Sequence, residues 1–333
     1  MSRNPNLILK EYIHGEFLST LYDVAPTSDN EAGLIYILPG NPGLPQYYVP
    51  FIKSLQRLLP DFRMVCVSQA GCDTNSLRLQ KPDFNSQRYY DLDDQVLHKL
   101  DVLKLLLKRY GYFEDFQKKR VIIIGHSIGC WILQNLLLHI KEQNWKIYNL
   151  STIMLFPTVK HIGQSSSGRK FRRILKFAPN ISILTATAVY YFCKYLPNRL
   201  LQTTINLFMN SPPKHGLLAT EDLIYSPSVV YQCVKLGEEE MSRVAEEADN
   251  VKSVFWSGSW NGSGRPGNIM AFFAHEDHWI GEHTRAELLQ EYSMRDNVQF
   301  EIFNKDDGIK HSFCLWNSET IARKVSIWIK KES

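Results

Sequence analysis

The sequence lacks the cysteine pattern of a secreted or zinc-binding protein. Its six cysteines are scattered over 333 residues, form no C-x-x-C pair and lie mostly in apolar surroundings. Such cysteines are typical of reduced thiols, so we expect neither a disulfide framework nor a zinc ribbon. Residues 1–5 are polar and begin no apolar run with a small-residue cleavage site, so no secretory signal peptide is expected. These absences favour a protein on the cytosolic side.

A strong charge of one sign is also missing. The chain has 38 basic and 34 acidic residues and a formal net charge of +4, which is too small to indicate nucleic acid as a partner. Its apolar share of 44% is enough for a full hydrophobic core. No internal repeat interrupts the chain, and we predict one domain over residues 1–333.

Short apolar runs rich in β-branched residues alternate with helical patterns from Gly33 onward. Runs bounded by glycine, proline or asparagine and separated by helices are typical of a mostly parallel sheet covered on both faces. Between the second and third runs, apolar residues recur at helical spacing from Leu92 to Tyr110, and Gly111 follows as a cap. The fold class is therefore α/β, with strands predicted over residues 34–38, 62–68, 121–124, 152–156, 269–274 and 298–303.

One motif places a serine between a β-branched run and an apolar helical stretch. Small residues two before and two after a serine let a strand turn sharply into a helix, which leaves the hydroxyl exposed as a nucleophile. The alternative is a structural turn whose serine caps the helix. We predict the nucleophile elbow of an α/β-hydrolase fold, with Ser127 as the nucleophile in Gly125-His126-Ser127-Ile128-Gly129.

A serine hydroxyl needs a histidine base and an orienting carboxylate, which follow in this fold in the order serine, acid, histidine. Asp277 lies just beyond a late predicted strand, where the fold places the acid. Glu276 and Asp222 are its competitors. His311 follows the last predicted strand by a short polar loop, so the order Ser127, Asp277, His311 fits.

The segment His275-Glu276-Asp277-His278, with His283 beyond it, has a rival interpretation as a metal site. A zinc-binding HExxH motif would require histidine at position 279, which is Trp279 here. We therefore interpret His278 and His283 as loop and helix-surface residues. No metal or organic cofactor is implied by the sequence.

The turn Pro39-Gly40-Asn41-Pro42-Gly43 follows the first strong strand. Glycine there allows the backbone to approach a ligand closely, and proline cannot donate an N–H. The backbone of Asn41 is thus the candidate donor of an oxyanion hole, together with the backbone N–H of Ile128 at the start of the helix after Ser127. The alternative is a plain glycine and proline turn.

Several blocks of this sequence together resemble the lipid droplet-associated hydrolase family. They are Leu38–Gly43 with Tyr47–Phe51, Gln95–Leu100, Ile124–Gly129, Leu155–Thr158, Asp277–Trp279 and His311. The resemblance implies an α/β-hydrolase of the lipid droplet and endoplasmic reticulum surface, with a modest esterase or lipase activity on sterol esters or triacylglycerols. Members commonly have proline after the acid, where this chain has His278.

Residues 158–250 break the strand rhythm and are predicted to be an inserted helical lid. Within them, residues 177–193 carry no charge and are flanked by basic residues, but seventeen residues are marginal for a bilayer span of about 20. Residues 169–199 are therefore predicted to contact a lipid surface, to cover the active site, or both. The acidic runs Glu238-Glu239-Glu240 and Glu246-Glu247-Ala248-Asp249 are interpreted as a solvated helix face.

The nucleophile motif and its partners predict a serine hydrolase, and the family resemblance implies that it acts on neutral lipid esters at the lipid droplet surface on its cytosolic side, with a pool on the endoplasmic reticulum. The alternative function is a droplet-surface organising protein that retains the fold with little turnover, because fold and motif do not by themselves establish a substrate.

Overall fold

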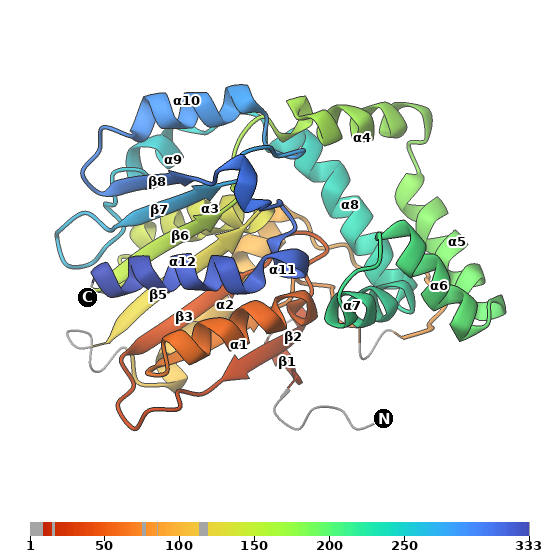
Figure 1. The fold of residues 1–333 in the computed structure, drawn as a ribbon, viewed down its shortest axis with the longest axis horizontal. Coiled ribbons are helices and arrows are strands. Elements are labelled where there is room, and N and C mark those ends of the chain that lie inside the picture. Colours follow the sequence, from red (N-terminus) through yellow and green to blue (C-terminus); the bar gives the residue numbers. More distant parts are fainter. Residues whose placement is uncertain (1–8, 15–16, 75–77, 85, 113–118, 333) are drawn as a thin grey trace.

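The computed structural model describes residues 9–14, 17–74, 78–84, 86–112 and 119–332, and a single twisted sheet forms its centre (Figure 1). In these residues eight strands lie in the order β1-β2-β4-β3-β5-β6-β7-β8. The pairs β1/β2 and β2/β4 are antiparallel, and all other pairs are parallel. The strands are β1 (Leu9–His14), β2 (Phe17–Val24), β3 (Gly33–Leu38), β4 (Phe62–Val67), β5 (Arg120–His126), β6 (Leu150–Leu155), β7 (Ile269–Phe273) and β8 (Val298–Ile302).

The six strands predicted from the apolar runs are confirmed as β3 to β8, with bounds that differ by a few residues. The central strand β3 is buried along its whole length, as a parallel strand covered on both faces must be. The antiparallel strands β1 and β2 were not among the predicted runs. The polar residues 1–5, which carried the prediction about a signal peptide, lie outside the described residues.

Helices cover both faces of the sheet (Figure 1). Helices α1 (Val49–Leu58) and α12 (Ser318–Lys331) pack together on one face, and α2 (Leu92–Arg109) and α3 (Ile128–Glu142) on the other. The predicted helix after Leu92 is confirmed as α2. It begins at a capping box in which the side chains of Asp91 and Asp94 each accept a backbone N–H of the other residue. Two further helices, α10 (Glu282–Tyr292) and α11 (Phe313–Trp316), follow β7 and β8.

The segment between β6 and β7, which we call the insertion, is helical and extends beyond the ends of the strands (Figure 1). Its last long helix, α8, lies between the sheet and the outer helices and packs against α5. Pro227 occupies the first turn of α8, where backbone N–H groups form no hydrogen bond within the helix, so the absence of an N–H in proline costs nothing. The helices are α4 (Ser166–Phe177), α5 (Ile181–Tyr195), α6 (Asn198–Phe208), α7 (Lys214–Ile224), α8 (Pro227–Arg243) and α9 (Asp249–Val254).

The prediction that both acidic runs are solvated is wrong for one residue in each. Glu240 is 5% exposed and Glu247 is 7% exposed. Glu247 accepts hydrogen bonds from Gln134, Trp256 and the Tyr292 hydroxyl at 3.1, 2.8 and 3.1 Å. Successive helical residues point about 100° apart, so adjacent acids in α8 cannot all share one solvated face.

Candidate active site

Ser127 occupies a sharp turn between β5 and α3. Its φ of 53° and ψ of −124° lie in a region that non-glycine residues rarely adopt, and such strain persists only where the surroundings enforce it. Two glycines make the turn possible. A Cβ atom at Gly125 would lie 2.7 Å from the carbonyl oxygen of Gly129, and one at Gly129 would lie 2.3 Å from that of Leu38. The backbone thus raises the Ser127 side chain above the sheet.

The side chains of Ser127, Asp277 and His311, which were predicted from their order in the chain, lie close together in the structure. Nε2 of His311 lies 2.9 Å from Oγ of Ser127, and Nδ1 of His311 lies 2.8 Å from Oδ2 of Asp277. Ser127 follows β5, Asp277 lies beyond the end of β7, and His311 lies between β8 and α11. Because the carboxyl ends of parallel strands meet at one edge of the sheet, residues 184 and 34 positions apart become neighbours.

The surroundings of Asp277 determine which nitrogen of His311 carries the proton. The Asp277 side chain is 4% exposed, and its Oδ1 accepts the backbone N–H groups of Trp279 and Ile280 at 2.8 and 3.2 Å. An ionised carboxylate only accepts hydrogen bonds, so Nδ1 of His311 must donate to it. Nε2 of the neutral ring is then free to accept the Ser127 proton.

The two competing acids lie elsewhere. The side chain of Glu276 is 73% exposed, and its nearest cation is Lys305 at 3.9 Å. Asp222, near the end of α7, pairs with Arg78 at 3.0 Å. Neither acid is hydrogen-bonded to His311 in the contacts of the described residues, whereas Asp277 is.

The rival metal interpretation of the histidine-rich segment gains no support from the geometry. His283 lies on α10, is 76% exposed and pairs with Glu287 at 2.8 Å. The backbone oxygen of His278 accepts hydrogen bonds from Ser166 and Ser167 at the start of α4. Among the residues that the structure describes, no cluster of three or more histidine, cysteine or acidic side chains could hold a metal ion.

The turn after β3 lies directly against the candidate nucleophile. A Cβ atom at Gly40 would lie 2.9 Å from Cβ of Ser127, so only glycine fits at this position. Asn41 follows Gly40, and Ile128 is the first residue of α3. The two predicted oxyanion residues are therefore on segments that border Ser127, and Ile128 adds the positive end of a 15-residue helix.

Tyr48, to which sequence reasoning assigned no role, connects this turn to the elbow. Its hydroxyl accepts the Gly40 N–H at 2.9 Å and lies 2.6 Å from Nδ1 of His126. Nε2 of His126 lies 2.9 Å from the backbone oxygen of His311 and must donate to it, so Nδ1 accepts the Tyr48 proton. Burial lowers the pKa of His126 to about 3, which keeps this ring neutral.

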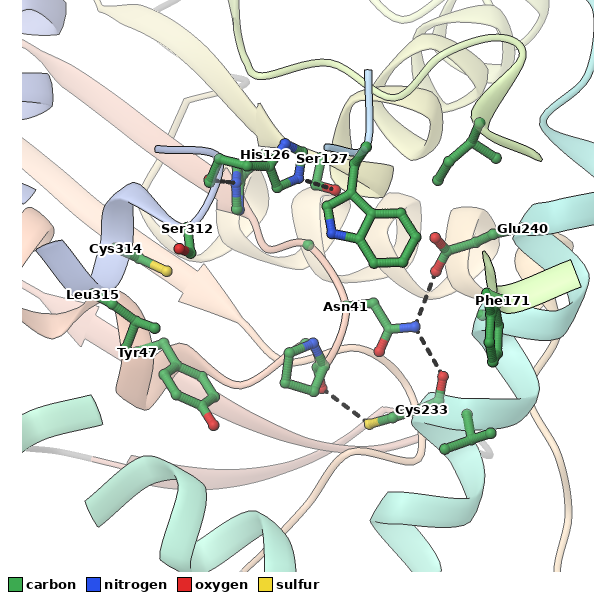
Figure 2. A pocket seen from close by; sticks show the side chains of 18 of the residues that line it. Asn41, Tyr47, His126, Ser127, Phe171, Cys233, Glu240, Ser312, Cys314 and Leu315 are labelled. Atoms are coloured by element: carbon green, nitrogen blue, oxygen red, sulfur yellow. Dashed lines mark hydrogen bonds between the residues drawn. The ribbon is translucent and has the colours of Figure 1, made fainter. Parts of the chain in front are cut away.

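A pocket with a volume of about 420 Å³ opens beside Ser127 (Figure 2). Its wall is mainly apolar and comes partly from the core fold and partly from α4 and α8 of the insertion, as Phe171, Val234 and Met241 illustrate. Glu240 is the acidic residue of this wall. Burial raises the pKa of its carboxyl to about 7, and a hydrogen bond from Asn41 partly opposes that shift.

The outer helices of the insertion expose large apolar side chains. Only three side chains of α5 are buried, and large exposed side chains continue onto α4 and α6. Within the described residues, no helix is long and apolar enough to cross a membrane. We call this region the outer surface; it comprises Ile174, Phe177, Ile183, Leu184, Tyr191, Phe192, Tyr195, Leu200, Leu207 and Phe208.

Comparison with known protein sequences identifies one family for most of the chain. The model of a family described as lipid-droplet associated hydrolase matches residues 31–314. The lipid droplet-associated hydrolase of Mus musculus is 25% identical over 305 residues, which are 89% of this chain and 84% of that protein. The protein of the same name from Dictyostelium discoideum is 23% identical and covers 96% of this chain and 95% of its own length.

Solved structures share the architecture at low sequence identity. A carboxylesterase of the thaumarchaeon Nitrososphaera gargenis superposes with a TM-score of 0.56 at 12% identity, over 96% of this chain and 97% of its own. Proline iminopeptidase of Mycobacterium smegmatis gives 0.54 at 13% identity over 96% of both chains. With these neighbours, the predicted α/β-hydrolase fold is confirmed.

Proposed function

Because the chain belongs to the lipid droplet-associated hydrolase family and is therefore a hydrolase, we propose that it cleaves the ester bond of neutral lipids through Ser127, His311 and Asp277. The observation that carries this proposal is the continuous hydrogen-bonded series from Ser127 Oγ through His311 to Asp277, at 2.9 and 2.8 Å. This series ends at an apolar pocket of about 420 Å³, which lies within the roughly 300–1,000 Å³ usual for small-molecule sites.

The first half of the reaction forms an acyl-enzyme. As Oγ of Ser127 attacks the ester carbonyl carbon, its proton passes to Nε2 of His311. Asp277 keeps the imidazole oriented and stabilises its positive charge. The backbone N–H groups of Asn41 and Ile128 hold the oxygen that becomes negative. The intermediate then collapses, the carbon–oxygen bond to the alcohol breaks, and His311 returns the proton to the departing alkoxide.

The second half repeats these steps with water. His311 takes a proton from a water molecule, whose oxygen attacks the acyl carbon of Ser127. The second tetrahedral intermediate collapses, the bond between Ser127 Oγ and the acyl carbon breaks to release the fatty acid, and His311 returns the proton to Oγ. No group other than those of the chain, the ester and water takes part in this scheme.

Neutral lipid esters are the proposed substrate class because the pocket wall is mainly apolar and because the relatives are named for lipid droplets. A pocket of this size takes up only part of a triacylglycerol or sterol ester. The remainder of the lipid would stay with the surface that delivers it.

We further propose that the outer surface docks the protein on the phospholipid layer of a droplet, or on the endoplasmic reticulum, from the cytosolic side. Phe177, Leu207 and Phe208 are 84%, 80% and 84% exposed, so their rings and branches can enter a lipid surface without unfolding anything. Basic residues of α4, the helix that ends at Phe177, face the solvent and suit acidic headgroups; these are Arg169, Lys170, Arg172, Arg173 and Lys176. The contact predicted for residues 169–199 thereby extends to Phe208.

A fluorophosphonate probe tests the activated serine directly. We expect labelling of the purified protein, loss of labelling in Ser127→Ala and in His311→Ala, and full labelling of the matched histidine variant His283→Ala, whose side chain is 76% exposed. Hydrolysis of triolein and cholesteryl oleate emulsions by the same proteins then tests the substrate class. An intact, folded protein that neither labels nor hydrolyses these esters contradicts the proposal and favours the alternative of a droplet-organising protein.

A further inference from the structure

Helix α8 of the insertion holds the turn that contains the candidate oxyanion donor (Figure 2). The side-chain amide of Asn41 donates to the backbone oxygen of Cys233 at 2.8 Å and to Oε1 of Glu240 at 3.0 Å. Both acceptors belong to α8, two helical turns apart. The thiol of Cys233 also donates to the backbone oxygen of Pro42 at 3.3 Å. Three hydrogen bonds thus connect two residues of the turn to one inserted helix.

Glu240 occupies a position where an acid is costly. It is 5% exposed, and within the part of the chain that the structure describes its side chain forms a hydrogen bond only with the Asn41 amide. A buried carboxyl without a cation loses its hydration without gaining an ion pair. An apolar side chain of similar size would pack against the neighbouring apolar wall without this cost. The hydrogen bond to the Asn41 amide is therefore the one interaction that an acid makes here and an apolar side chain could not.

Glycine at position 237 leaves room for this contact. A Cβ atom there would lie 3.7 Å from Nδ2 of Asn41 and 3.3 Å from the ring of Phe171. Larger side chains at this position would compete with the amide for the same space. The surface of α8 between Cys233 and Glu240 is thus shaped to receive Asn41.

We propose that Glu240 is a positioning residue, which fixes the Asn41 side chain and thereby the backbone N–H that would stabilise the oxyanion. The inference rests on the proposed ester hydrolysis. Its physical reason is that catalysis by hydrogen-bond donors depends on their placement before the reaction, and a misplacement of about 1 Å can cost on the order of 10²-fold in rate. In this arrangement the insertion completes the active site in addition to covering it.

The decisive variants differ in whether position 240 can still accept a hydrogen bond. Glu240→Leu removes the acceptor, and we expect kcat on a soluble p-nitrophenyl ester to fall about ten- to a hundredfold while KM changes little. Glu240→Gln keeps an acceptor oxygen, so its kcat should stay within about threefold of the native value. A purely space-filling role would not separate these two variants.

Glu239→Leu is the matched control on the same helix. Glu239 accepts hydrogen bonds from the Tyr89 hydroxyl and the Leu92 N–H and pairs with Arg243, so it holds α8 on α2 and does not contact Asn41. We expect this variant to unfold at a lower temperature with kcat per folded molecule unchanged. An equal loss of kcat in both leucine variants would overturn the inference.

Asn41→Ala tests the contact from its other side and serves if Glu240→Leu does not fold. It should lower kcat as much as Glu240→Leu, and the double variant should be no slower than either single variant. An undiminished kcat in Asn41→Ala, in native protein that labels and hydrolyses esters, would overturn the inference and leave the proposed hydrolysis intact. Absence of both reactions in the native protein would contradict the proposed function itself.

Discussion

The hydroxyl of Tyr48 lies 2.6 Å from Nδ1 of His126, and this contact connects two loops of the candidate site. Tyr48 also accepts the Gly40 N–H, and His126 also donates to the backbone oxygen of His311. The turn after β3 and the loop that carries His311 are therefore parts of one hydrogen-bonded series. Every member of this series is neutral, so its geometry does not depend on a titration near pH 7.

Replacing Tyr48 by phenylalanine should loosen both loops at once. Tyr48→Phe leaves the Gly40 N–H and Nδ1 of His126 without a partner in a buried region, and we expect a loss of about 1–3 kcal/mol in the free energy of unfolding, with a lower kcat. Urea unfolding and ester hydrolysis measure the two effects. Tyr47→Phe is the control, because in the described residues the Tyr47 hydroxyl forms a hydrogen bond only with Thr220, and Thr220 has a second acceptor in the backbone oxygen of Gly216. A larger loss of stability in Tyr47→Phe than in Tyr48→Phe would contradict the role given to the Tyr48 hydrogen bonds.

The assignment of the acid is tested by Asp277→Asn. An amide at this position can donate its N–H₂ group to Nδ1 of His311, which then places the ring proton on Nε2, where it blocks proton transfer from Ser127. We expect kcat to fall by about 10³–10⁴ with little change in thermal stability. Glu276→Gln should stay within about twofold of the native rate. A larger fall of kcat in Glu276→Gln than in Asp277→Asn would instead assign the acid that orients His311 to Glu276.

Protein stability should depend on pH through Glu240. Burial raises the pKa of its carboxyl to about 7 from its ordinary value of 4.5, so between these values the folded protein holds a proton that the unfolded chain has released. The free energy of unfolding therefore falls as the pH rises through this window, by about 3 kcal/mol in total. Glu239, Tyr89 and Cys233 are the titratable neighbours of Glu240.

Comparison of native protein with Glu240→Gln isolates this effect. The variant should show a flatter dependence of the free energy of unfolding between pH 5 and about 7.5, measured by urea unfolding. His126 acts in the opposite direction, because its lowered pKa makes the folded state less stable as the pH falls below about 6.5, but it is common to both proteins and cancels. Parallel pH profiles for the two proteins would contradict the buried titration of Glu240.

Exposed apolar side chains of the outer surface should strengthen the binding of the protein to lipid droplets. Phe177→Asp and Phe208→Asp replace side chains that are both 84% exposed, and we expect each to weaken binding to phospholipid-coated triolein droplets about tenfold. Flotation of droplets with purified protein measures the bound fraction. Met294→Asp is the matched control, because Met294 is 90% exposed but follows α10 and is not part of the outer surface. Equal loss in the control would mean that the outer surface has no special part in docking.

The strands β3 to β8 could be predicted from the sequence because buried parallel strands require continuous apolar runs, which contrast with the amphipathic helices between them. Ser127 could be located because its elbow imposes small residues at fixed spacing. Asp277 and His311 followed from chain order, although Glu276 remained open because adjacent acids in a loop look alike in sequence. Only the three-dimensional structure shows that Asp277, and not Glu276, contacts His311.

Tyr48 and Glu240 could not be assigned a role because their partners are distant in the chain. Glu240 lies 199 residues from Asn41, and no local pattern distinguishes it from the other two glutamates of the same acidic run. Tyr48 lies 78 residues from His126. Contacts of this kind arise from packing of the insertion and of the turn before α1 against the site, which neither periodicity nor motif spacing encodes.

The hydrogen bonds between Asn41 and α8 also bear on how such enzymes can be recombined. A chimera that received the insertion of a distant relative would lose the carboxylate of Glu240 unless an acceptor recurred at the same place, and the Asn41 amide would then face a foreign surface. The turn after β3 and the insertion almost 120 residues later are therefore one hydrogen-bonded unit. Grafting experiments that aim to exchange lipid specificity should transplant both segments together.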